Sequence, residues 1–319
     1  MKRLNLLSLF LLFTFTTGLK AQLPNAPEEI EAYKLQMINN PHDTEELPTQ
    51  SFVNSPESLT DFNLQFFYEL TGPMGEAAVE TDGEYIYVGK WNDTPIDKYD
   101  LDGNLIETFT IADIGHFCDF AWDGSRLYAT DGSSFVYEID PVNRVLTGTI
   151  VTEHLLRGIA YNDNEDVFYG SNLSSPIVSF DRQGNTVDQY PLQVISGLYG
   201  LAFDNVSPDG PYLWGFSQFS SVLVQYSVPD IIETGVTFSV NDDLGLPDAV
   251  AGGLAFSDNI SPGTVSLLGI LQSQAIFAYS AGQTVNFDND VAVTSILAQF
   301  RRRPYRQRTG YRKGKELRQ

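Results

Sequence analysis

From residue 61 onward the chain alternates short runs of aromatic and β-branched residues with turns rich in Asp, Asn, Gly and Pro. This pattern predicts short strands joined by tight turns. Before it, residues 26–39 carry apolar side chains at helical spacing behind a capping Asn25, which predicts one short amphipathic helix. A polar linker follows and extends to residue 60. No other segment predicts a helix of any length, so the expected fold class is all-β with a short N-terminal helix.

A fixed order of four strands recurs about every 40 to 50 residues along the chain. The first strand of each unit carries an alanine: Ala78, Ala121, Ala160, Ala202 and Ala255. Four strands in such a unit form the blade of a β-propeller, in which a small residue on the innermost strand leaves room around the central channel. We therefore predict a propeller of about five four-stranded blades within residues 61–300.

The residues that precede the first unit predict how the ring closes. Residues 62–67, Phe-Asn-Leu-Gln-Phe-Phe, stand where the outer strand of a preceding blade would be. We expect this segment to pair with the blade that Ala255 begins, because that pairing removes a free sheet edge. The alternative is that residues 284–287 supply that outer strand, which implies a sixth, incomplete blade.

The N-terminus has the pattern of a secretory signal. Lys2 and Arg3 precede an almost entirely apolar run over residues 4–15, and the small residue Ala21 offers a cleavage site. The apolar run is short for a bilayer span. We expect residues 1–21 to be removed and the protein to be secreted, extracellular or on a bacterial cell surface. Cys118 is the single cysteine, so no intrachain disulfide can form.

Charge is distributed unevenly along the chain. Lys and Arg total 19 against 41 Asp and Glu, yet residues 22–300 hold only seven of these cations against 40 acids, a net charge of −33. Such a body repels nucleic acid and anionic lipid, so we expect neither as a partner, and we expect no membrane span.

The last 19 residues, 301–319, carry nine cations and few apolar side chains, which predicts a basic, disordered tail. Two interpretations are open. The tail is genuine and binds the acidic body, a polyanion or a membrane surface. Otherwise the gene is truncated or frame-shifted, Phe300 is the last authentic residue and downstream domains are lost. The abrupt change in composition favours the second.

Four segments together resemble the propeller-like modules of large secreted bacterial proteins exported by the type IX pathway. They are GEAAVETDG at residues 75–83, KWN at 90–92, RGIAY at 157–161 and GPYLWGFSQ at 210–218. The resemblance covers about residues 61–281. It implies an extracellular or surface module of unassigned function, usually followed by further β domains and a sorting domain. Nothing after Phe300 resembles that sorting domain.

One blade has a second resemblance. Residues 122–133, WDGSRLYATDGS, with Ile-Asp-Pro at 139–141, look like a blade of the five-bladed glutaminyl cyclotransferases. The alternative function is therefore a propeller enzyme that resembles those proteins or lactonases. We find no matching catalytic set, and no nucleophile motif, phosphate-binding loop or dinucleotide fingerprint.

Candidate ligand-binding residues come from aligning the repeats on their alanines. The alignment places Glu76 and Asp119 at equivalent positions, and it places Arg157 and Tyr199 one residue earlier in their own blades. Propellers bind ligands at the mouth of the channel, so these side chains, with Trp91 nearby, predict a site for a small molecule, a cation, a glycan or a peptide end. The alternative is that Glu76 or Asp119 pairs with Arg157 as structural packing.

The sequence contains few residues in a pattern that would bind a metal ion or a cofactor. Three acidic runs, at residues 162–166, 241–243 and 288–290, leave calcium possible, although the first lacks the glycine and the final glutamate of an EF-hand loop. Zinc is not expected, because the three histidines are scattered and the cysteine is alone. We expect no other cofactor. The predicted function is a secreted or cell-surface binding module, with an unidentified small-molecule, glycan or protein ligand and no catalytic activity.

Overall fold

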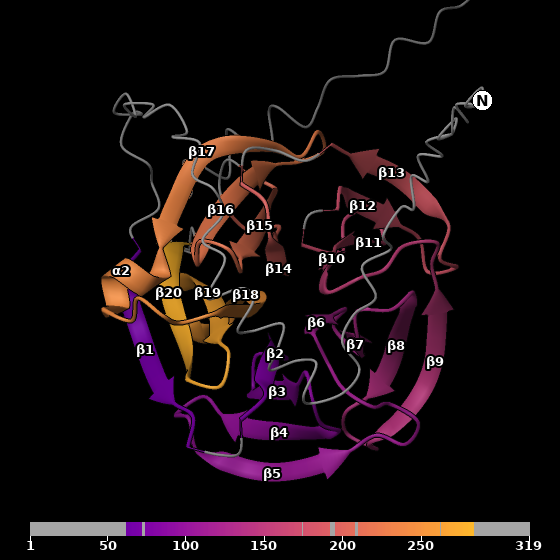
Figure 1. Ribbon diagram of the computed structural model, residues 1–319, viewed down its shortest axis with the longest axis horizontal. Helices are drawn as coiled ribbons and strands as arrows, with labels where there is room; N and C mark the ends of the chain where they lie inside the picture. Colours follow the sequence, from indigo (N-terminus) through magenta and orange to yellow (C-terminus); the bar gives the residue numbers. More distant parts are fainter. Residues whose placement is uncertain are drawn as a thin grey trace, which may run out of the picture. The chain divides into compact units, whose positions relative to one another are not determined.

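The computed structural model describes residues 62–283, apart from 72–73, 174, 192–194, 208–209 and 262. In this part of the chain, five four-stranded antiparallel sheets form a ring around a central axis (Figure 1). The prediction of an all-β propeller of five blades is confirmed. The expected signal peptide, N-terminal helix, linker and basic tail lie outside the described residues.

Four of the blades are each formed by consecutive strands, the innermost first. They are β2 (Glu76–Thr81), β3 (Tyr85–Lys90), β4 (Pro95–Asp100) and β5 (Leu105–Thr110); β6 (Asp119–Trp122), β7 (Leu127–Thr130), β8 (Phe135–Asp140) and β9 (Val145–Val151); β10 (Gly158–Asn162), β11 (Val167–Ser171), β12 (Ile177–Phe180) and β13 (Thr186–Tyr190); and β14 (Leu198–Asp204), β15 (Tyr212–Ser217), β16 (Val222–Ser227) and β17 (Ile232–Ser239).

The fifth blade joins the two ends of the ring. It consists of β18 (Ala251–Ser261), β19 (Thr264–Leu271), β20 (Ala275–Gln283) and, outermost, β1 (Leu64–Glu69). Phe67 pairs with Phe277 and Glu69 with Ala275, and the indigo β1 lies beside the yellow β20 in Figure 1. The predicted closure by residues 62–67 is therefore confirmed.

A short helix interrupts the connection between the fourth and fifth blades. The sequence pattern predicts a loop there, but α2 (Val240–Leu244) forms one turn with Ser239 as its N-cap and Gly245 in the left-handed region after it. Val240 is buried against the core of the neighbouring blades. No helix among the described residues is long and apolar enough to cross a membrane.

Aspartates at the first turn of a blade determine the strand register. Asp82 Oδ1 accepts the backbone N–H of Tyr85 at 2.7 Å, and its Oδ2 accepts the hydroxyl of Tyr87 at 2.8 Å. In the next blade, Asp123 Oδ1 and Oδ2 accept the backbone N–H of Arg126 and the hydroxyl of Tyr128 in the same way. The two Asp-Gly turns are thus equivalent positions of the repeat.

This equivalence corrects the alignment of the first blade by two residues. Glu80 pairs with Tyr87 just as Ala121 pairs with Tyr128, so Glu80, and not Ala78, occupies the place of the repeated alanine. Ala78 is then level with Asp119, and Glu76 is not. The sequence alignment was wrong in this blade because β2 contains two adjacent alanines, Ala77 and Ala78. The Asp-Gly turn identifies equivalent positions in the first two blades correctly.

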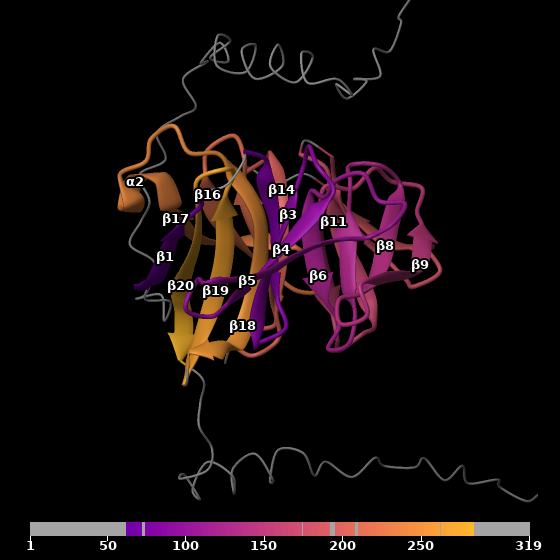
Figure 2. The same cartoon turned by 90° about the horizontal axis from the view of Figure 1, so that it is seen from below.

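The blades stand side by side around the axis (Figure 2). Apolar side chains pack between each neighbouring pair of blades. Between the first two blades, Tyr87, Phe117 and Phe120 are all buried. A side chain at Gly89 would come within 2.6 Å of the Phe120 ring, so this second-strand position must be glycine for the blades to approach. The inner strands are thereby held around a narrow channel.

Candidate functional site

The channel has two mouths, which we name by the direction of the inner strands. The start mouth lies where β2, β6, β10, β14 and β18 begin, and the end mouth lies where they finish. Near the start mouth, one level of the inner strands consists of Ala78, Asp119, Gly158, Gly200 and Gly253.

Asp119 closes the channel at this level. Its side chain is completely buried, and its carboxylate accepts backbone N–H groups from Ile159 at 3.0 Å, Leu201 at 3.1 Å and Leu254 at 3.3 Å. Each donor belongs to a different blade. A Cβ at Gly253 would lie 2.4 Å from Asp119 Oδ1, so the glycine provides the space that the carboxylate fills. Burial raises the pKa of Asp119 well above its usual range, although the backbone donors oppose this effect.

The other predicted acid has a structural partner as well. Glu76 lies 3.3 Å from the ammonium of Lys90, which is also 3.7 Å from Asp97. Both Glu76 and Lys90 are buried. The alternative that an acid pairs with Arg157 does not hold among the described residues, because Glu76 pairs with Lys90 and Asp119 with backbone groups.

The remaining predicted residues do come together at the start mouth. Arg157 lies with its guanidinium carbon 5.7 Å from the centre of the Tyr199 ring. Trp91 packs against the buried cluster of Ala77, Cys118 and Tyr199. Burial raises the pKa of the Cys118 thiol to about 11, so the thiol stays protonated near neutral pH. These side chains lie together at the start mouth, and Arg157 and Trp91 are partly exposed there.

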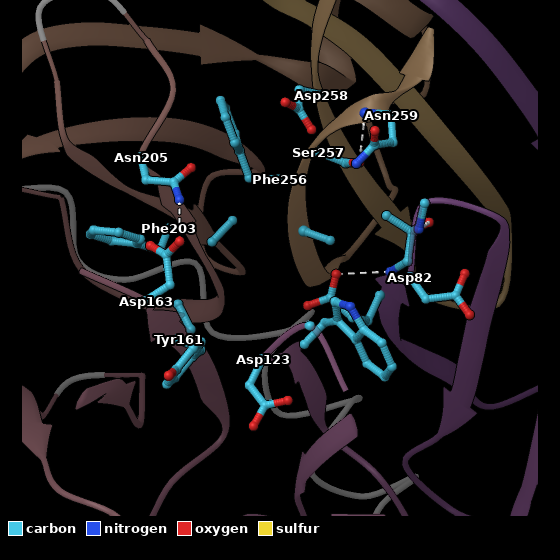
Figure 3. Close-up of a pocket in the computed structure, with 18 of the residues that line it drawn as sticks. Asp82, Asp123, Tyr161, Asp163, Phe203, Asn205, Phe256, Ser257, Asp258 and Asn259 are labelled. Atoms are coloured by element: carbon cyan, nitrogen blue, oxygen red, sulfur yellow. Dashed lines mark hydrogen bonds between the residues drawn. The ribbon is translucent and has the colours of Figure 1, made fainter. Parts of the chain in front are cut away.

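The end mouth, in contrast, holds a cavity of about 330 Å³ (Figure 3). We call it the acidic pocket. Five of the residues that line it are acids: Glu80, Asp82, Asp123, Asp163 and Asp258. Four are aromatic: Trp122, Tyr161, Phe203 and Phe256. No Lys, Arg or His is among the described residues that line the acidic pocket.

Glu80 lies on β2 at the level of the alanines that line the pocket, Ala160, Ala202 and Ala255. Its side chain is almost buried, and its Oε1 accepts the backbone N–H of Thr81 at 2.8 Å. Burial raises the pKa of Glu80 to about 8, and the charge of Asp82 adds to this effect. A carboxyl with so raised a pKa, set in a cavity, is typical of functional sites.

The other four acids, which we call the rim acids, differ in how many hydrogen bonds they accept from the protein: Asp82, Asp123, Asp163 and Asp258. Asp82 and Asp123 hold their turns, as described above, and Asp163 accepts the side-chain amide of Asn205 at 2.7 Å. Asp258 is exposed. In Figure 3, Asp123 and Asp163 lie on one side of the cavity, and Asp82 and Asp258 lie on the other. Asp123 is engaged further by Arg182, whose guanidinium lies 3.1 Å from its carboxylate, so Asp258 is the rim acid most open to a ligand.

Sequence reasoning missed the acidic pocket but contained its signal. In four of the five repeats an aromatic residue follows the alanine, namely Trp122, Tyr161, Phe203 and Phe256. These aromatic side chains form much of the pocket wall. A glutamate in the alanine's place, Glu80, is the second signal, and the two-residue misalignment concealed it.

Metal-binding groups do not assemble in the described part of the chain. No cluster of three or more His, Cys, Asp or Glu side chains there is arranged to hold a metal ion. Asp243 accepts the hydroxyl of Tyr279, and Asp166 pairs with Arg182. The acidic run at 288–290 lies outside the described residues. Calcium binding stays a prediction without a defined site.

Comparisons with known proteins find likeness in structure alone: no family model and no curated protein matches the chain. A glutaminyl cyclase from Myxococcus xanthus is 12% identical over 68% of this chain and 96% of that chain, with a TM-score of 0.53. A chain in a structure of the mitotic checkpoint complex is 9% identical over 77% of this chain and 100% of that one, with a TM-score of 0.46. The first likeness concerns the fold of the ring and identifies no activity.

Proposed function

We propose that this protein is a binding module whose acidic pocket takes a small organic cation, such as an ammonium or guanidinium group on an apolar stem. The observation that carries the proposal is a cavity lined by five carboxyl groups and no cationic side chain among its described residues. Charges of one sign gathered around a concave site raise the local concentration of the opposite charge. An organic cation is the ligand that this arrangement attracts.

The aromatic residues of the wall narrow the ligand class further. A cation over the face of Trp, Tyr or Phe is attracted by the ring, and this attraction grows when water is excluded. The Arg182 guanidinium carbon already lies 5.0 Å from the centre of the Tyr161 ring, so the aromatic residues left for a ligand are Trp122, Phe203 and Phe256, on three other inner strands. Hydrated metal ions gain little from such a wall, whereas an alkylammonium gains from both the rings and the carboxylates.

The cavity also limits the size of the ligand. A volume of about 330 Å³ is at the lower end of the range for small-molecule sites. It fits one side chain or one small amine rather than a folded segment. The Asp119 carboxylate closes the channel beyond the pocket floor. The ligand therefore enters and leaves at the end mouth.

The cellular setting of the proposal comes from the sequence. The leader at residues 1–21, the acidic body and the resemblance to type IX modules support a secreted or surface-exposed binding module. Its cationic ligand would then be a small molecule, or a Lys or Arg side chain of another macromolecule. Release of residues 1–21 during export is checked by N-terminal sequencing of the secreted protein.

The proposal is tested with benzyltrimethylammonium, whose charge does not change with pH. Titration calorimetry at pH 8.5 should show binding by the wild type and a loss of about tenfold in Glu80→Gln, because the negative charge at the pocket floor is removed. Benzyl alcohol is the neutral control ligand. Glu138→Gln, which changes an acid beside Arg126 outside the pocket, is the matched control and should bind normally. Equal affinity for the cation and the alcohol would overturn the proposal.

A second candidate function is catalysis, and the observation that favours it is the Glu80 carboxyl. A group with a pKa of about 8 is mostly protonated at pH 7 and can both give and accept a proton at a bound substrate. The fold likeness to a glutaminyl cyclase makes peptides with N-terminal glutamine the first substrates to screen, with lactones second. Turnover that disappears in Glu80→Gln would support an enzyme. No turnover by the wild type would leave binding as the function.

A further inference from the structure

Arg157 differs from the other arginines that the structure describes. Arg126, Arg144 and Arg182 each pair with a carboxylate, at 3.3, 2.5 and 2.6 Å respectively. Arg157 makes no ion pair within the described part of the chain, although acids far outnumber cations there. An arginine without a carboxylate partner in so acidic a protein needs an explanation.

The guanidinium of Arg157 also has an unsatisfied donor. Its Nε is buried and makes no hydrogen bond within the described residues. Buried polar groups normally have a hydrogen-bond partner, so an unpartnered one calls for an explanation, and this nitrogen is the one cationic group among the seven such atoms of the described residues. The residue as a whole is half-buried, and the rest of the group can therefore be reached from solvent.

The surroundings hold the guanidinium in place and provide apolar contact. The Tyr199 ring is 5.7 Å from the guanidinium carbon, and Tyr199 is itself buried. Trp91 and Leu173 pack at the edge of the same cluster and are partly exposed. The carboxylate of Asp131, which acts on the Cys118 thiol of this cluster, accepts hydrogen bonds from Ser133 and Tyr137 and makes no ion pair with Arg157 in the described part of the chain.

We propose that the start mouth is a second binding site, in which Arg157 binds the carboxylate of a small ligand whose apolar part contacts Trp91 and Leu173. A guanidinium presents its N–H groups in a planar fork that matches a carboxylate, and the part of the Arg157 group that solvent reaches is the part that a ligand would contact. The site is independent of the acidic pocket, because the Asp119 carboxylate separates the two mouths.

The test uses benzoate and the full-length protein. In nitrogen–proton correlation spectra, the Arg157 Nε–H resonance, assigned by its absence in Arg157→Lys, should shift saturably with benzoate. Benzamide has the same ring without the charge and should leave the resonance in place, as should chloride at matched ionic strength. Affinity for benzoate should fall at least tenfold in Arg157→Gln. Arg144→Gln, which removes a paired surface arginine, should bind normally.

Several outcomes would overturn the second site. Absence of a saturable Nε–H shift in the wild type does so without any variant, so a folding defect in Arg157→Gln cannot mask the answer. Tighter binding of inorganic phosphate than of benzoate would overturn the carboxylate class. Glu80→Gln distinguishes this site from the acidic pocket: it should weaken benzyltrimethylammonium and leave the affinity for benzoate unchanged. Loss of benzoate binding in Glu80→Gln would mean that the mouths are not independent.

Discussion

The two mouths of the channel are formed by the same five inner strands, yet a buried carboxyl group crosses the channel near the start mouth and a cavity lies at the end mouth. At the start mouth, Asp119 takes a place where three blades have glycine, and its carboxylate ties four blades together. At the end mouth, Glu80 takes a place where the other blades have alanine. An acid in a small-residue position thus closes the channel near one mouth, and a second acid places an ionisable carboxyl group on the floor of the other.

We expect the largest effect from replacing Asp119, whose carboxyl group closes the channel between the two mouths. Asp119→Ala leaves the N–H groups of Ile159, Leu201 and Leu254 buried without an acceptor. At about 1–3 kcal/mol for each lost acceptor, we expect unfolding free energy to fall by roughly 4 kcal/mol in urea denaturation. Asp119→Asn keeps one acceptor oxygen and should lose about half as much. A loss under about 1 kcal/mol in Asp119→Ala would show that packing, not Asp119, seals the channel.

Stability should depend on pH through Glu80. Its folded-state pKa of about 8 exceeds the ordinary value of 4.5, so the folded protein binds this proton more tightly than the unfolded chain. The resulting stability is complete below pH 4.5 and disappears as pH rises through 8. Glu80→Gln has no such proton, so its unfolding free energy relative to wild type should rise by about 4 kcal/mol between pH 5 and 9. A constant difference across urea denaturations at these pH values would contradict the buried, protonated carboxyl.

Cation binding should depend on pH in the opposite direction. A cation in the acidic pocket favours ionised Glu80, so binding releases a proton whenever the carboxyl starts protonated. We expect affinity for benzyltrimethylammonium to rise several-fold between pH 6.5 and 8.5 and to level off above the pKa. Calorimetry in buffers of different ionisation heat measures the released proton. Glu80→Gln should give a flat profile, and benzoate at the start mouth should not follow this curve.

The smallest effect is expected at the rim. Asp258 is exposed, so solvent and salt screen its charge. Asp258→Asn should weaken benzyltrimethylammonium about twofold, and the difference should vanish in high salt. An effect as large as that of Glu80→Gln would place the ligand at the rim instead of at the pocket floor.

The architecture was predictable because its signals are local and repeated. Alternating strands, Asp-Gly turns and alanines recur often enough to predict five blades, and residues 62–67 predict the closing strand. The gathering of Arg157, Tyr199 and Trp91 follows from their places near the start of the inner strands. These inferences need only the order of the elements.

The positions of Glu76 and Glu80 depend on the pairing register between β2 and β3, which the sequence repeats do not specify. A shift in pairing lies between Glu76 and Ala78. A shift of two residues keeps a side chain on the same face of its strand, so hydrophobic alternation could not reveal the error. In the structure Glu76 pairs with Lys90, and Glu80, four residues later, is the acid of β2 that lines the acidic pocket. The acidic pocket itself combines turns from several blades, a relation that no single repeat contains.

Closure by β1 also determines the order in which the ring can be completed. Phe67 and its partner Phe277 are separated by about 210 residues, so this pairing has a very high contact order. During synthesis β1 is the first strand to be made and can pair only when β20 follows, whereas the intervening blades have all their strands nearby. An interrupted chain would therefore leave β1 unpaired and would expose the apolar faces of the first and fourth blades that pack against the fifth, and such surfaces are prone to aggregation. The ring of five blades can therefore close only after β20 has been made.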